Sequence, residues 1–162
     1  MPEKRTLQRA KQDAREGKAP STQAGEFVRE EMEHIREGKH GARSTKQAIA
    51  IGLSKARRAG VKLGAPPRTA KKTTRRSAAS AARAGRRPAG PSRTRSRATL
   101  KALKREPRRA ASHEALARQA RQSARRRGPA ARRAAGRKAV ATKGRQGLRA
   151  AARKAAATRR AA

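Results

Sequence analysis

The sequence predicts a mostly α-helical protein, with a small N-terminal helical hairpin of two to three helices followed by a long basic tail that is intrinsically disordered or conditionally helical. Two observations predict this fold class. The chain of 162 residues carries 47 Lys plus Arg against 10 Asp plus Glu, a formal net charge of +37, and it contains one Phe and no Trp or Tyr. Because aromatic side chains supply much of the buried area of a core, the chain lacks the means to build one along its whole length.

Charge divides the chain near Gly60. The residues before it include 14 basic and 8 acidic side chains and those after it 33 basic and 2 acidic ones, so the net charges are +6 and +31. Most large apolar residues of the first part lie in residues 27–35 and 49–63. We therefore expect a helical head at residues 1–63 and an Arg/Ala-rich low-complexity tail at residues 64–162.

The first helix of the hairpin is expected to start at Ser21, after Pro20, and to run to about Glu37, with Gly38 as its left-handed C-terminal stop. Spacings of one, four and three residues place its apolar side chains on one face: Phe27, Val28, Met32 and Ile35. Residues 4–16, with a single large apolar side chain, predict a weaker helix before this one.

The second helix is expected to begin at the capping box formed by residues 44–47 and to close at Gly60. Its apolar and small residues recur at i, i+3, i+4 and i+7, as Ile49, Gly52, Leu53 and Ala56. The head has about ten large apolar side chains for some sixty residues, a meagre core that a homodimer through the head would enlarge.

The tail contains latent helices separated by helix breakers. The blocks are residues 98–105, 108–127, 130–142 and 148–160, and the breakers are Pro107, Gly128-Pro129 and the segment 144–147. Ala, Arg and Lys favour helix, but like charges three and four residues apart repel one another. We therefore expect the free tail to be mostly coil and to become helical when phosphates remove that repulsion.

The charge of the tail predicts binding to a nucleic acid. Double-stranded DNA carries about one charge per 1.7 Å of axis, so a net charge of +31 matches roughly 50 Å of duplex, or about fifteen base pairs. A coding bias could explain Arg in place of Lys but not the loss of acids from one half. The expected function is sequence-tolerant binding of double-stranded DNA, with bridging or compaction, and the alternative is an RNA-binding or ribosome-associated protein.

The candidate nucleic-acid contacts are basic residues near the second helix or grouped along the tail. In the head they are Lys39, Arg43, Lys46, Lys55, Arg57 and Arg58. In the tail they are Lys71, Lys72, Arg75, Arg76, Arg86, Arg87, Arg108, Arg109, Arg125, Arg126, Arg127, Arg132, Arg133, Arg137, Lys138, Arg159 and Arg160. The loop at residues 38–45 is either a backbone clamp for phosphate or an ordinary turn. Base reading by Gln47 and Ser54 is a minority hypothesis.

An acidic stripe runs along the first helix of the hairpin, at Glu26, Glu30, Glu33 and Glu37. Such stripes are usually solvated. This one could also hold part of the basic tail in the free protein, compete with DNA or contact a basic partner.

The sequence predicts no enzyme, cofactor, small-molecule substrate or metal site. Cys is absent, and His34, His40 and His113 are dispersed without an HExxH pattern. No apolar run approaches the roughly 20 residues of a membrane span, so we expect a cytoplasmic protein. Adsorption to an anionic membrane is disfavoured because the tail has few large apolar residues, namely Leu100, Leu103, Leu116 and Leu148.

Two resemblances bear on these expectations. The segments STQAGEFVREE at residues 21–31 and GKHGARSTKQAIAIGLSKARRAG at residues 38–60 resemble a bacterial domain family of unknown function whose members join such a head to a variable basic tail. This resemblance covers roughly residues 1–63 and implies a bacterial protein. The composition of the tail is similar to that of linker histones and bacterial histone-like proteins, which implies DNA compaction, although this tail is far richer in Arg than in Lys.

Overall fold

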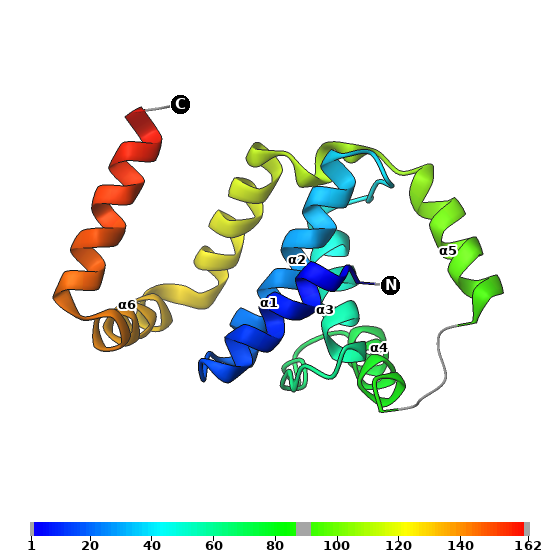
Figure 1. The fold of residues 1–162 in the computed structure, drawn as a ribbon, viewed down its shortest axis with the longest axis horizontal. Coiled ribbons are helices and arrows are strands. Elements are labelled where there is room, and N and C mark those ends of the chain that lie inside the picture. Colours follow the sequence, from blue (N-terminus) through cyan, green and yellow to red (C-terminus); the bar gives the residue numbers. More distant parts are fainter. Residues whose placement is uncertain (1, 87–91, 161–162) are drawn as a thin grey trace. The chain divides into compact units, whose positions relative to one another are not determined.

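The structure is a computed structural model that describes residues 2–86 and 92–160. In these residues it contains six α-helices and one short 3-10 helix, without any strand (Figure 1). The prediction of a mostly α-helical protein is confirmed. The chain forms two compact units, residues 1–117 and residues 118–162, and each is described by itself below.

The predicted hairpin is present as α2, Pro20–Arg36, and α3, Thr45–Arg58, and α1, Lys4–Arg15, precedes it. Gly38 has a φ of +79° and Gly60 a φ of +90°, the left-handed conformation that ends a helix most readily at glycine. α2 begins at Pro20 rather than at Ser21. Proline suits the first helical position because its φ is already helical and that position needs no N–H donor.

The predicted cap at Ser44 forms at the start of α3, with one difference from a capping box. The Ser44 hydroxyl oxygen accepts a hydrogen bond from the Gln47 N–H at 3.3 Å. The Gln47 side-chain oxygen accepts one in return from the Arg43 N–H at 2.8 Å. The first bond satisfies a donor that the first turn of a helix otherwise leaves free. The second engages the N–H of the residue before the cap, whereas a capping box would engage the N–H of Ser44 itself.

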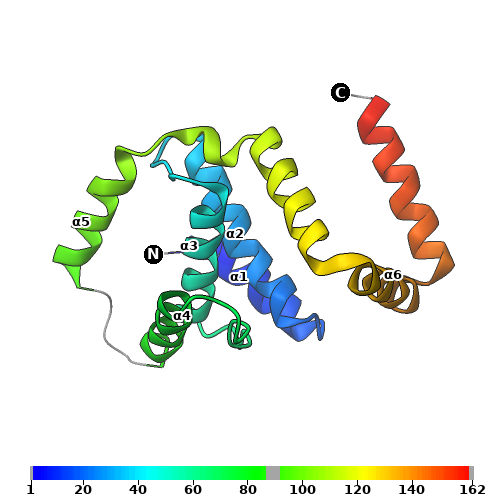
Figure 2. The ribbon, with the colours of Figure 1, turned by 180° about the vertical axis from the view of Figure 1, so that it is seen from behind.

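α2 and α3 lie side by side, in front of α1 when the molecule is seen from behind (Figure 2). Phe27 is fully buried between the three helices, in a cluster with Ala10, Ala24 and Ala56. Gly52 lets the two helices approach closely, because a Cβ atom at Gly52 would lie 2.7 Å from the Val28 Cα. The predicted apolar faces of both helices are therefore the ones that pack.

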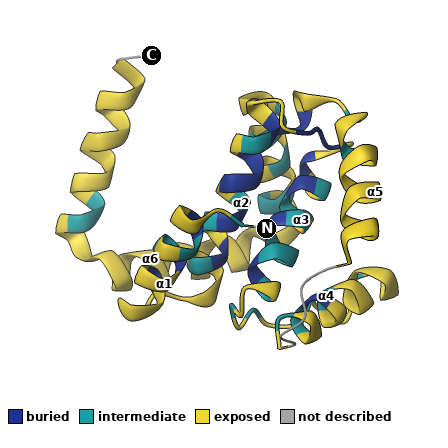
Figure 3. Cartoon of the chain, turned by 45° about the vertical axis from the view of Figure 1, so that its right-hand side comes forward, coloured by how far each residue is buried: buried dark blue, intermediate teal, exposed yellow. Residues whose placement is uncertain are grey.

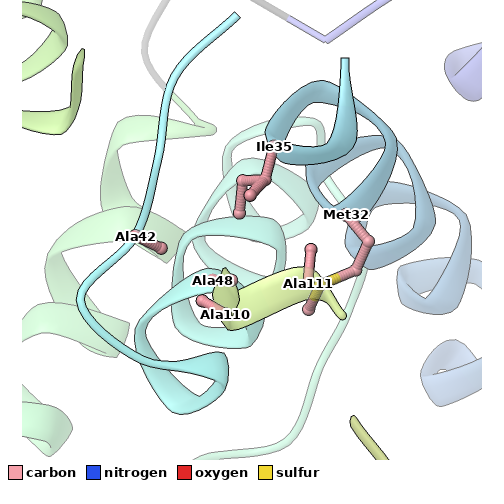
Figure 4. Close-up of a cluster of buried hydrophobic side chains, with 6 residues drawn as sticks. All are labelled: Met32, Ile35, Ala42, Ala48, Ala110 and Ala111. Carbon is pink, nitrogen blue, oxygen red and sulfur yellow. The ribbon is translucent and has the colours of Figure 1, made fainter. Parts of the chain in front are cut away.

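A second cluster includes residues of the tail. Met32 and Ile35 of α2 and Ala48 of α3 pack against Ala110 and Ala111 (Figure 4). The two tail alanines belong to the 3-10 helix η1, Arg108–Ala111, and are almost completely buried. The compact unit thus extends to residue 117, well beyond the predicted boundary at residue 63.

Residues 103–111, called the returning segment below, are held by hydrogen bonds to the loop between α2 and α3. The Gly41 N–H donates to the Leu103 carbonyl at 2.9 Å, and the Ala42 N–H donates to the Pro107 carbonyl at 3.1 Å. The buried Thr45 hydroxyl donates to the Ala110 carbonyl at 2.7 Å. The loop and the segment therefore satisfy each other's backbone groups in a place from which water is largely excluded.

Two further helices belong to the first unit. α4, Lys72–Ala84, packs against α3 through a face that includes the buried Ala81. α5, Arg93–Lys104, has no buried residue.

The last helical stretch, α6, covers His113–Arg160 and is broken by non-helical backbone at Gly128 and Gly144. The predicted breakers therefore interrupt the tail, but its blocks are helical. This corrects the expectation of a disordered tail that is mostly coil. The high helix propensity of Ala, Arg and Lys applies at nearly every position, whereas each repulsive pair costs only about 0.2–0.5 kcal/mol.

Candidate nucleic-acid interface

The second unit presents cations without any carboxylate. Residues 118–160 contain 13 Arg and 3 Lys and no Asp or Glu. All 16 of these basic residues are exposed, and so are most of the other residues of α6 (Figure 3). The predicted contacts that lie here are Arg125, Arg126, Arg127, Arg132, Arg133, Arg137, Lys138, Arg159 and Arg160.

Sequence reasoning missed a row of arginines in the last segment of α6. Arg145, Arg149 and Arg153 follow one another at i, i+4 and i+8 and are all exposed. This spacing places them on one face of the helix, about 6 Å apart along its axis. The i, i+4, i+8 spacing is visible in the sequence, but the contacts predicted in the tail are all adjacent basic residues.

α4 carries a second basic surface, in the first unit. Lys72, Arg75 and Arg76 are exposed and lie on one side of the helix, and Arg83 extends the row by two turns. The predicted contacts Lys71 and Arg86 flank α4 and are also exposed. Arg87, another predicted contact, lies outside the described residues.

Lys55 does not share the surroundings of the other predicted contacts. Its side chain is 20% exposed, and its ammonium nitrogen lies 3.2 Å from Glu30 Oε1 and 2.7 Å from Glu31 Oε2. Both of these glutamates are buried. We therefore leave Lys55 out of the interface, because a phosphate would have to compete with two buried carboxylates for it.

The remaining predicted contacts of the first unit differ in their availability. Lys39 is half-exposed and pairs with Glu37 at 2.9 Å and Glu3 at 3.2 Å. Hydrogen bonds to these carboxylates, with that of Glu37 the stronger influence, raise the pKa of Lys39. Arg57 is partly buried and donates to the Gly64 carbonyl at 3.2 Å. The others are exposed, namely Arg43, Lys46, Arg58, Arg108 and Arg109.

The loop at residues 38–45 is not arranged as a phosphate clamp. The N–H groups of Gly41 and Ala42 donate to carbonyls of the returning segment, as described above. The Gln47 side-chain oxygen is engaged in the helix cap, so it is not available for reading a base edge. Of the two readings of this loop, the structure matches the ordinary turn with local caps.

Three of the four glutamates of the acidic stripe, Glu26, Glu30 and Glu37, make contacts within the head. Glu26 lies 3.6 Å from Arg9 of α1. Glu30 is 2% exposed and accepts a hydrogen bond from the Glu3 N–H at 3.0 Å. Burial acts to raise the pKa of Glu30, but the hydrogen bonds from Thr6, Glu3 and Lys55 outweigh it, so that the pKa is lowered. Glu33 is exposed.

Two of the histidines that were expected to be dispersed lie together. One ring nitrogen each of His34 and His40 and one Glu31 carboxylate oxygen lie within 4.8 Å of one another. Glu31 and His34 are three residues apart on α2, a spacing visible in the sequence. The approach of His40 depends on the path of the following loop, which no local pattern reveals.

Comparisons with known proteins concern the head. Residues 19–69 match the model of a family of unknown function (DUF6496), which covers α2, α3 and the loop between them. No curated protein matches the chain, and no solved structure does. Among the helices that the structure describes, none is both long enough and apolar enough to cross a membrane.

Proposed function

We propose that this protein binds double-stranded DNA with little regard to base sequence and acts as a nucleoid-associated protein in a bacterium. The observation that carries the proposal is the set of 16 exposed cations in residues 118–160, where no carboxylate is present. Basic side chains in an acid-free segment release the counterions of DNA when they contact its phosphates, and this release drives binding.

The charge of the second unit is large enough to supply strong binding by itself. With about one phosphate per 1.7 Å of duplex axis, 16 cations match about 27 Å, or roughly eight base pairs. Arg is the main cation, and its planar guanidinium forms paired hydrogen bonds with phosphate and enters narrow minor grooves.

Two basic surfaces on different units favour bridging of DNA. α4 carries its row of cations in the first unit, and α6 carries most of its cations in the second. A chain with two sets of phosphate contacts can hold two duplexes, or two parts of one duplex. Compaction of DNA follows from such bridging.

The salt dependence of DNA affinity tests the proposal. The logarithm of the binding constant falls with the logarithm of salt concentration by about 0.9 per neutralised phosphate. Replacing Arg125, Arg126 and Arg127 by Gln should therefore reduce the slope by up to about 2.7. The same three positions changed to Lys keep their charge and should keep the slope. Equal affinity at low and high salt for the unchanged chain would contradict the proposal.

Competition between nucleic acids separates DNA binding from the alternative. Unrelated duplexes of equal length should compete equally for the protein, because phosphate contacts carry no base information. A structured RNA that displaces DNA at equal phosphate concentration would instead assign the protein to RNA or ribosome binding. The absence of Trp and Tyr disfavours recognition by base stacking but not contacts with folded RNA.

A further inference from the structure

We propose that Glu31, His34 and His40 form a binding site for a divalent transition-metal ion of the Zn²⁺ class. The three side chains come from α2 and from the loop that follows it. Glu31 is fully buried, His40 is 8% exposed and the His34 side chain is 12% exposed. The site is thus partly closed to water, with one open side at His34.

One oxygen of the buried Glu31 carboxylate lacks a hydrogen-bond donor among the described residues. Lys55 Nζ lies 2.7 Å from Oε2 and compensates the charge on that oxygen, whereas Oε1 accepts no hydrogen bond from the described residues. Oε1 faces His40 Nε2 at 3.4 Å. An unsatisfied buried carboxylate oxygen is costly, and a bound cation at Oε1 would remove that cost.

The outer hydrogen bonds of both imidazoles leave a nitrogen of each ring ready to bind a metal ion. His40 Nδ1 lies 3.1 Å from the Gly41 carbonyl, and His34 Nε2 lies 2.8 Å from a carboxylate oxygen of Glu3. Each of these oxygens is an acceptor, so the nitrogen that faces it carries a proton. In a neutral ring the other nitrogen then has a free lone pair, and hydrogen bonds of this kind accompany histidine ligands in metal sites.

In the neutral form, His40 Nε2 therefore points a lone pair at a carboxylate oxygen. Two acceptor atoms 3.4 Å apart repel each other unless a proton or a metal ion lies between them. Zn²⁺ bonds of about 2.0–2.1 Å in a tetrahedral site separate two ligand atoms by roughly 3.3 Å, close to this spacing. The third ligand atom, a nitrogen of His34, lies within 4.8 Å of the other two.

The ligand chemistry selects the class of metal. Two imidazoles and one carboxylate suit Zn²⁺ and neighbouring transition metals, whereas Mg²⁺ and Ca²⁺ prefer oxygen ligands throughout. Three protein ligands leave a fourth position for water. Metal binding would fasten α2 to the loop that receives the returning segment, and would thereby stabilise the head independently of DNA binding.

The test is a Zn²⁺ titration of the full-length, tag-free protein after removal of metal and nucleic acid, with a chromophoric chelator as competitor. The unchanged chain should bind one Zn²⁺, and its thermal midpoint should rise on binding. His34→Gln and His40→Gln should abolish this binding, and His113→Gln, at an exposed histidine outside the site, should leave it intact. Glu3→Gln should weaken it by roughly tenfold, because Glu3 only orients His34.

Co²⁺ provides a readout that does not depend on stability. In the unchanged chain it should give the visible absorption of a four-coordinate site, and His40→Gln should remove that absorption while far-UV circular dichroism confirms that the variant is folded. Should the unchanged chain bind no Zn²⁺, or should both folded histidine variants bind it as the unchanged chain does, the proposed site would be refuted.

Discussion

Gly52 of α3 and Gly25 of α2 are both helical glycines, but only Gly52 lies against another helix. They therefore serve as test and control positions for the same substitution. A Cβ at Gly52 would lie 2.7 Å from the Val28 Cα and 3.0 Å from the Phe27 carbonyl oxygen, both backbone atoms. A Cβ at Gly25 would meet no atom within 4 Å, and this position is exposed. The same substitution therefore has opposite expected effects at the two positions.

Gly52→Ala should destabilise the head by about 2 kcal/mol, because the two helix backbones must move apart. Gly25→Ala should stabilise it by up to about 1 kcal/mol through the higher helix propensity of Ala. Chemical unfolding followed by circular dichroism measures both changes. Equal effects of the two substitutions would show that α2 and α3 are not in close contact at Gly52.

Lys55 is the second residue whose surroundings lead to a sharp prediction. Lys55→Met would remove the only cation within ion-pair distance of the buried Glu31 Oε2 among the described residues. Loss of one partner from a buried pair typically costs about 3–5 kcal/mol, so a destabilisation in that range is expected in the presence of a metal chelator.

Lys46→Met serves as the control, because Lys46 is exposed on the same helix and its replacement should change stability by under about 0.5 kcal/mol. Unfolding midpoints of the two variants provide the comparison. A stability of Lys55→Met equal to that of Lys46→Met would contradict the structural role given to Lys55.

At the scale of elements, the two breaks in α6 have different causes. Gly128 has a φ of +73° and precedes Pro129, which disfavours a helical conformation in the residue before it. Gly144 has a φ of +64° but is followed by Arg145. The first break is therefore encoded twice, whereas the second depends on one glycine.

Gly144→Ala should convert this position to helix, because Ala strongly disfavours a positive φ and strongly favours helix. The helical signal at 222 nm should rise. Gly128→Ala should produce a smaller rise because Pro129 still interrupts the helix. A larger rise for the Gly128 variant would show that Pro129 does not maintain the first break.

For the whole molecule, the segment that returns from the tail completes the head. Ala110 and Ala111 are buried against α2 and α3, and Leu116 packs on the same cluster. Four hydrogen bonds join residues 103–111 to Arg36, Gly41, Ala42 and Thr45. Their net contributions make this segment part of the fold of the first unit.

A chain that ends at residue 117 should therefore keep the stability of the head in the full-length protein. A chain that ends at residue 104 lacks η1 and Leu116, and the stability of its head should fall by on the order of 2 kcal/mol. Thermal unfolding of the two truncated chains measures the difference. Identical midpoints would show that residues 105–117 do not stabilise the head.

The sequence by itself determined the features that depend on near neighbours. The helix cap at Ser44, the glycine stops at Gly38 and Gly60 and the apolar faces of α2 and α3 were predicted because each signal acts within about four residues. The charge division was also predicted, since it is a property of composition. The prediction that the tail is mostly coil is wrong, because helix propensity outweighs the repulsion between like charges.

Only the tertiary structure decided which polar and small residues of distant segments meet. Ala110 and Ala111 look like any other alanines of a low-complexity tail, yet they are buried in the head. Lys55 looks like a phosphate contact, yet it pairs with Glu30 and Glu31. These contacts join segments about 25 to 75 residues apart in the sequence. Such long-range pairings depend on the path of the whole chain, which periodicity and local propensity do not predict.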